Sequence, residues 1–153
     1  MHDIGNVIKR VDHSQSGTIM SFRILDKIGF DESEIAKIIK AIGNYDEGNG
    51  VPISPMAAAL ILADKSDVRR SRVRNSDINS FDIHDRVNYS VTDNKLKIDM
   101  DKREVYLILE VDNHFSTVMD YFSIFMERMK LCEKTAMMLG LKFKLVINDQ
   151  EVI

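Results

Sequence analysis

The chain has 153 residues, of which 44% are hydrophobic and 29% charged, and its formal net charge is -3. This composition supports a packed globular core, and the weak negative charge excludes a general attraction to nucleic acid or to an anionic membrane. A single cysteine excludes an intrachain disulfide and no apolar run reaches the roughly 18 residues of a membrane helix, so we expect a cytoplasmic protein.

The first part of the chain is predicted to be helical. In the segment 12–30, four apolar side chains recur at the spacing of a helix face, and Gly29 follows where the helix is expected to end. Asp31 is the expected N-cap of a second helix, with Glu34 three residues on, as in a capping box. The apolar residues of the two helices are Ile19, Phe22, Leu25 and Ile28, and then Ile35, Ile38, Ile39 and Ile42.

A third helix is predicted to begin after Ser54, the expected N-cap, with Pro55 at its first position. Its centre, 57–63, is apolar all round, which predicts a buried helix. The basic run that follows is expected to continue the helix. Three of its side chains would then share one helix face at i, i+4 and i+7: Lys65, Arg69 and Arg72. The segment 76–91 is expected to hold one more short helical piece.

The pattern changes near residue 90. Alternating residues on both sides of a polar turn at Asp101 and Lys102 predict a β-hairpin, and a long helix is expected from Thr117 to Leu139. A last strand places Phe143 and Leu145 on one face. The predicted fold class is therefore α+β. We expect a mostly helical domain at 1–90 and a small antiparallel β-β-α-β module at 91–153. The expected apolar side of the long helix comprises Met119, Phe122, Phe125, Met126 and Met129.

Four residues of the helical part have side chains that bind divalent metals: His2, Asp3, His13 and Asp64. Imidazole and carboxylate ligands together suit manganese, iron, zinc or magnesium. Asp64 ends the most hydrophobic helix, where an ionised carboxylate needs a partner because burying a bare charge is costly. A metal ion is one such partner, and Lys65 or an arginine is the other.

These residues lie in segments that resemble the HD-domain metal-dependent phosphohydrolases: HDIGN at 2–6, DHSQSG at 12–17, GNYDEGNGVP at 43–52 and LADKSD at 62–67. The resemblance implies that His2 and Asp3 are the metal-binding doublet, that Asp64 is the distant aspartate, and that His13 is the extra histidine of two-metal members. Tyr45 stands about where those members have another histidine. We expect Tyr45 to be a half-buried loop residue. No GYP triplet accompanies the DEGNGVP run, so cleavage of a cyclic dinucleotide is not implied.

The activity implied by the resemblance is hydrolysis of a phosphate ester, with a nucleotide as one candidate substrate. A divalent metal (Mn, Fe, Mg or Zn) would activate water, and Asp3 and Asp64 would be the catalytic carboxylates that hold the metal and orient the water. The basic residues Lys65, Arg69 and Arg72 would bind the phosphate. The alternative is a catalytically inactive relic of the family that serves as a binding, regulatory or dimerisation module.

The family's first metal ligand is a histidine on a helix before the doublet, and no such helix precedes His2 here. We therefore expect an N-terminally truncated member. The loss of helices would expose apolar side chains such as Ile4, Val7 and Ile8, so we expect a homo-oligomer. Nucleic-acid binding through the arginine run is a weaker expectation, since no aromatic residues interleave the arginines. The second doublet, His84-Asp85, is expected to be coincidental.

Overall fold

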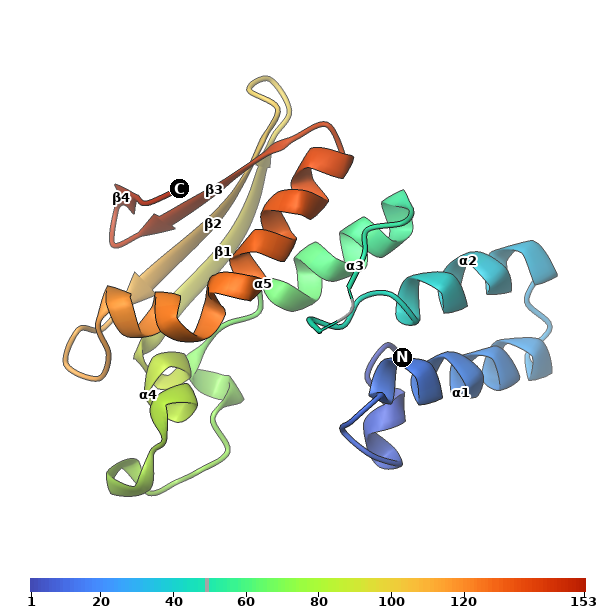
Figure 1. Cartoon of the computed structure of the whole chain (residues 1–153), viewed down its shortest axis with the longest axis horizontal. Coiled ribbons are helices and arrows are strands. Elements are labelled where there is room, and N and C mark those ends of the chain that lie inside the picture. The colour runs from blue at the N-terminus through green and yellow to red at the C-terminus, as the bar shows by residue number, and fades with distance from the viewer. Residues whose placement is uncertain (49) are drawn as a thin grey trace. The chain divides into compact units, whose positions relative to one another are not determined.

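The structure, a computed structural model, describes residues 1–48 and 50–153 (Figure 1). The chain forms two compact units, Met1–Leu62 and Ala63–Ile153, with helices in both and a four-stranded sheet in the second, so the α+β class is confirmed. Asn49, within the run 43–52, lies outside the described residues. Over the described chain, no helix has both the length and the apolar character of a membrane span.

The first unit contains the short 3-10 helix η1 (Ile4–Val7), α1 (His13–Lys27), α2 (Glu32–Ile42) and most of α3 (Pro55–Lys65). The predicted helix ends are confirmed by their caps. Gly29 has a φ of 78° after α1, and the Asp31 carboxylate accepts hydrogen bonds from the backbone at the start of α2. The hydroxyl of Ser54 accepts one from the Ala57 amide at 3.1 Å.

The helical spacing predicted for the first apolar residues is confirmed by α1. Of these four residues only Leu25 is buried, whereas Ile19, Phe22 and Ile28 are exposed. The inner face of α1 is instead made of small residues, because η1 and α2 approach its backbone closely. These residues are Ser14, Gly17 and Ser21, beside Leu25. In α3 one side of the apolar segment also remains exposed, at Ala59 and Ala63.

The second unit contains a sheet in the order β1-β2-β3-β4, with α5 lying across it (Figure 1). The predicted hairpin, long helix and last strand are confirmed. The prediction that the module is antiparallel is wrong, because β2 and β3 are parallel, with Leu107 opposite Leu145. The reason is that α5 returns the chain along the sheet, so that both strands start at the same end. The elements are β1 (Val91–Asp99), β2 (Glu104–Val111), α5 (Val118–Met138), β3 (Lys142–Ile147) and β4 (Gln150–Glu151).

The core of this unit lies between α5 and the two central strands. On β2 the buried residues are Val105, Leu107, Leu109 and Val111, and they alternate with half-buried residues on the opposite face. Phe125 and Met129 are the members of the predicted apolar side of α5 that are buried. Met119 and Met126 are exposed, so this side of the helix is narrower than expected.

The expectation that α3 continues through the basic run is wrong, because the helix ends at Lys65. The Asn94 amide of β1 donates to the carbonyl oxygens of Ser66 and Val68, at 2.5 and 2.9 Å, and so holds this stretch against the sheet in extended and turn conformations. Three short helices follow: η2 (Arg70–Arg72), η3 (Ile78–Ser80) and α4 (Ile83–Ser90).

The segment 63–90 packs with the strands that follow it. Arg70 donates through Nε to the Tyr89 carbonyl at 2.6 Å, and its guanidinium carbon lies 4.3 Å from the centre of the Tyr89 ring. Asp112, directly after β2, donates its backbone amide to Ser90 at 2.8 Å. The compact units therefore divide after Leu62, earlier in the chain than the domain boundary expected near residue 90.

Candidate functional site

Two glycines bring the His2-Asp3 doublet to the start of α1. A Cβ atom on Gly5 would lie 2.0 Å from the His13 carbonyl oxygen and 2.7 Å from the Gly17 amide nitrogen. A Cβ on Gly17 would in turn lie 3.1 Å from the His2 carbonyl oxygen. Only residues without a side chain allow this approach of backbone to backbone. The segments 2–6 and 12–17 are therefore neighbours in space, and His13 is the first residue of α1.

Tyr45 is the buried centre of this site. Its side chain is 1% exposed, and its hydroxyl donates to Asp3 Oδ1 at 2.7 Å. The same hydroxyl oxygen lies 2.6 Å from His13 Nε2. The expectation of a half-buried loop tyrosine is therefore wrong. Residues from three separate segments meet at one phenol, which fixes the orientation of the Asp3 carboxylate.

The hydrogen bonds of His13 define what its ring can do. Nδ1 lies 2.8 Å from the Arg10 carbonyl oxygen, which can only accept, so Nδ1 carries a proton. Nε2 lies 2.6 Å from the Tyr45 hydroxyl oxygen, which also donates to Asp3. Both ring nitrogens of His13 therefore contact protein oxygens, and these contacts tie His13 to Tyr45 and Asp3.

His2 and Asp3 present a nitrogen and an oxygen ligand side by side. His2 Nε2 lies 3.5 Å from Asp3 Oδ2, and the two side chains are 33% and 52% exposed. The His2 ring also packs edge-on against the Tyr45 ring, with centroids 5.1 Å apart. An imidazole and a carboxylate at this spacing fit the donor set of a divalent transition metal. They account for two of the three protein ligands typical of a catalytic site.

Asp46 is a second residue that the sequence did not assign to the site. Its Oδ2 lies 4.0 Å from His13 Nδ1, and its Oδ1 accepts the Glu47 amide at 2.8 Å. His13 thus lies between two carboxylates, since Asp3 Oδ1 is 3.4 Å from its Nε2. The signal in the sequence that could have identified both residues was the position of Tyr45, where two-metal members of the family that the sequence resembles have a histidine.

Asp64 belongs to the second unit, in the last turn of α3. Its Oδ2 lies 2.7 Å from Lys65 Nζ, and the two side chains are 15% and 5% exposed. Lys65 is therefore one partner of the largely buried Asp64 carboxylate. The ammonium of Lys65 is also buried, which removes it from the solvated basic face on which phosphate contact was expected.

Arg69 and Arg72 share one carboxylate, that of Asp67. Arg69 Nε lies 2.7 Å from Asp67 Oδ1, and Arg72 Nη1 lies 3.1 Å from Oδ2. Because α3 has already ended, the two arginines are not on one helix face with Lys65. Asp67 neutralises part of the positive charge that a phosphate would need.

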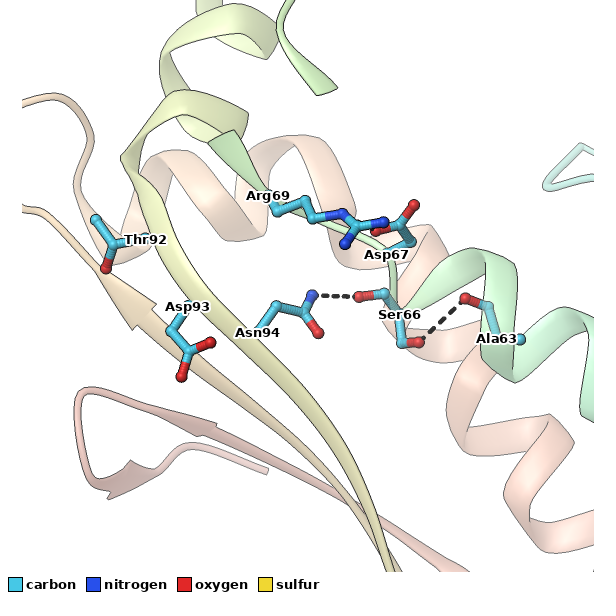
Figure 2. A pocket seen from close by; sticks show the side chains of 7 residues that line it. All are labelled: Ala63, Ser66, Asp67, Arg69, Thr92, Asp93 and Asn94. Carbon is cyan, nitrogen blue, oxygen red and sulfur yellow. Dashed lines mark hydrogen bonds and ion pairs between the residues drawn. The ribbon is translucent and has the colours of Figure 1, made fainter. Parts of the chain in front are cut away.

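A pocket of about 520 Å³ lies between this segment and β1 (Figure 2). Arg69 contributes the guanidinium of the pocket, and Asp67 and Asp93 contribute carboxylates. A hydrogen bond from the Lys95 side chain and one from the backbone N–H of Asn94 keep the pKa of Asp93 below its ordinary value. Two carboxylates against one guanidinium disfavour an anionic ligand here. The residues that line it are Ala63, Ser66, Asp67, Arg69, Thr92, Asp93 and Asn94.

Comparison of the chain with protein-family models, with curated proteins and with solved structures finds no match. The HD-domain assignment therefore stays a prediction, and its basis is the four segments named above together with the chemistry of the residues in them.

Proposed function

We propose that the chain is a metal-dependent phosphohydrolase that acts on a phosphate ester, with His2 and Asp3 as metal ligands and with Asp64 as the further ligand that the resemblance implies. The observation that carries the proposal is the His2-Asp3 pair, whose ligand atoms lie 3.5 Å apart beside a buried tyrosine that orients the carboxylate. Ligands held in place by a second layer of hydrogen bonds are typical of metal centres. A surface dipeptide needs no such support.

The roles of the residues follow from their contacts. Tyr45 donates to Asp3 Oδ1, and Asp3 Oδ2 lies 3.5 Å from His2 Nε2, so an ion held by both residues would lie beside this pair. A bound divalent metal would polarise the phosphate oxygens and lower the pKa of water. Asp3 would orient the attacking water, and the resemblance implies the same role for Asp64.

A second candidate is a non-catalytic binding or regulatory module that derives from such an enzyme. The observation that favours it is that protein partners already satisfy several of the expected functional groups. Asp64 pairs with Lys65, Arg69 pairs with Asp67, and both nitrogens of His13 contact protein oxygens. Such pairs stabilise a fold without any ligand.

Metal analysis of the purified full chain separates the two candidates. The metal bound per chain is measured after loading with manganese or iron, in the wild type and in Asp3→Asn and Asp64→Asn. Asp85→Asn, in the second His-Asp doublet, is the matched control. The enzyme proposal expects near-stoichiometric metal that both site variants lose and the control keeps, together with hydrolysis of p-nitrophenyl phosphate or nucleoside monophosphates. Metal-free protein without turnover would contradict it and support the binding module.

A further inference from the structure

The sheet of the second unit has a polar face opposite α5. The side chains of β2 alternate, so that Val105, Leu107 and Leu109 lie toward α5 while Tyr106 and Ile108 lie on the other face. The side chains on this outer face are half-buried or exposed. We name this surface the outer sheet face. It comprises the odd positions 93–99 of β1, the even positions 104–110 of β2, the even positions 142–146 of β3, and Glu151 of β4.

The register of the strands arranges these side chains in rows across the sheet. One row runs Lys95, Ile108, Val146, Glu151 from β1 to β4. It has a positive charge at one end, two apolar side chains in the middle and a negative charge at the other end. If a second copy of this row lies against it in the reverse order, each charged side chain faces one of opposite charge and each apolar side chain faces an apolar one.

Two further rows also carry charged side chains. The row next to the first runs Lys97, Tyr106, Lys144, and the one beyond it runs Asp99, Glu104, Lys142. When such rows face their own reverse, Glu104 meets Lys142 and the Tyr106 ring meets an ammonium, which are both favourable contacts.

We propose that the outer sheet face is a dimer interface between two copies of this chain, with a two-fold axis parallel to the strands between β2 and β3. With that axis, each row of one copy faces the same row of the second copy in the reverse order, so that β1 faces β4 and β2 faces β3. Lys95 then faces Glu151 of the second copy, and Ile108 faces Val146. The contact is isologous, because each residue pair occurs twice.

The alternative two-fold axis, perpendicular to the strands, is disfavoured by the same charges. It would place Glu104 of one copy against Glu110 of the other, and Lys95 against Lys97, given the register of β1 on β2. Like charges in direct opposition are strongly unfavourable at an interface. The charge pattern therefore specifies both the partner and its orientation.

The size of the face indicates a weak dimer. With strands about 4.8 Å apart and residues about 3.3 Å apart, the four strands form a patch roughly 15 by 20 Å. This is below the roughly 800 Å² per partner of a standard interface. We therefore expect an association that depends on protein concentration. Lys95 and Glu151, with side chains 70% and 54% exposed, are its outer contacts. Within one chain they pair with Asp93 and Lys144, each at 2.6 Å, so the second copy adds a further partner to each charge.

The test is a charge exchange followed by sedimentation equilibrium of the full chain. Lys95→Glu alone and Glu151→Lys alone should each weaken dimerisation roughly tenfold or more, since each variant makes two like-charge contacts. Mixing the two single variants should give a heterodimer, because the carboxylate introduced by Lys95→Glu then faces the ammonium introduced by Glu151→Lys. Lys130→Glu on α5, a reversal of the same kind away from the outer sheet face, should leave the dimer unchanged.

Each other outcome overturns the proposal. A wild type that stays monomeric up to millimolar concentration excludes the interface. A dimer that is insensitive to the Glu151 reversal, or that pairs through the edge of β1, excludes this face, because Glu151 lies on the far side of the sheet from β1. Circular dichroism of every variant confirms that it is folded, so a loss of dimer is not a loss of fold.

Discussion

The hydroxyl of Tyr45 donates to the carboxylate of Asp3 at 2.7 Å, across 42 positions of the sequence. This bond ties a loop after α2 to the doublet before η1, and His13 completes it from the start of α1. The Asp3 carboxylate of the candidate site is therefore held by a part-buried hydrogen-bond network that joins three segments of the chain.

Tyr45→Phe should destabilise the first unit. The substitution keeps the ring but removes the hydroxyl, so His13 Nε2 and Asp3 Oδ1 each lose a partner in a largely buried setting. We expect the free energy of unfolding to fall by about 1–3 kcal/mol, measured by urea denaturation. Tyr89→Phe, which keeps ring contacts to Phe81 and Phe115, is the control and should change stability less.

The same Tyr45→Phe protein should bind metal more weakly than the wild type. Loss of the hydroxyl allows the Asp3 carboxylate to rotate, and loss of such supporting hydrogen bonds typically costs about 10–100-fold in affinity. Isothermal titration calorimetry with manganese measures the effect at a temperature where both proteins are folded. Equal affinities would mean that Tyr45 has only a structural role.

Gly5→Ala should disrupt the contact between η1 and α1. The added methyl group would lie 2.0 Å from the His13 carbonyl oxygen, which is backbone and cannot rotate away. We expect a loss of at least about 1–3 kcal/mol in the free energy of unfolding, or failure to fold. Gly48→Ala is the matched control, because among the described residues, apart from its chain neighbours, no atom lies within 4 Å of its Cβ position. A Gly5 variant as stable as this control would show that the close backbone approach is absent in solution.

Asp67→Asn tests whether the arginine cluster is structural. The pairs of Asp67 with Arg69 and Arg72 are partly exposed, so their removal should change stability by less than about 1 kcal/mol. The two guanidinium groups would then be available, and the affinity for inorganic phosphate should rise. Phosphorus NMR titration of the wild type and the variant measures this. An unchanged affinity would exclude Arg69 and Arg72 as phosphate contacts.

Asp120 should link the stability of α5 to acid pH. Hydrogen bonds from the backbone amide and then the hydroxyl of Thr117 keep the pKa of Asp120 below the ordinary value of 3.8. A lowered folded pKa means that this contribution to stability is present above about pH 3.8 and is lost as the pH falls through the folded pKa. Thr117→Val removes the hydroxyl but not the amide, so the pKa of Asp120, followed by carbon NMR, should rise part of the way to 3.8. A pKa that stays where it was would show that the hydroxyl does not contribute.

Local signals in the sequence are enough to predict most of the helices and strands. Asp31, Ser54 and Thr117 are recognisable as helix starts because a capping side chain acts on amides two or three residues away. The hairpin of β1 and β2 follows from alternation around a polar turn. In the candidate site, His2 and Asp3 stand out by residue type alone. All of these signals operate over a few residues, so no tertiary contact is needed to see them.

Contacts between distant segments are settled by tertiary packing. Alternation in β3 is the same for a parallel or an antiparallel neighbour, so the path of α5 determines that β3 runs parallel to β2. The end of α3 at Lys65 depends on Asn94, which lies 28 residues after Ser66. The burial of Tyr45 and the exposure of Ile19 follow from the glycine contacts of η1 with α1. Strand direction, the end of a helix and the burial of a side chain depend here on packing and hydrogen bonding between segments far apart in the chain. The local periodicity of the sequence does not determine them.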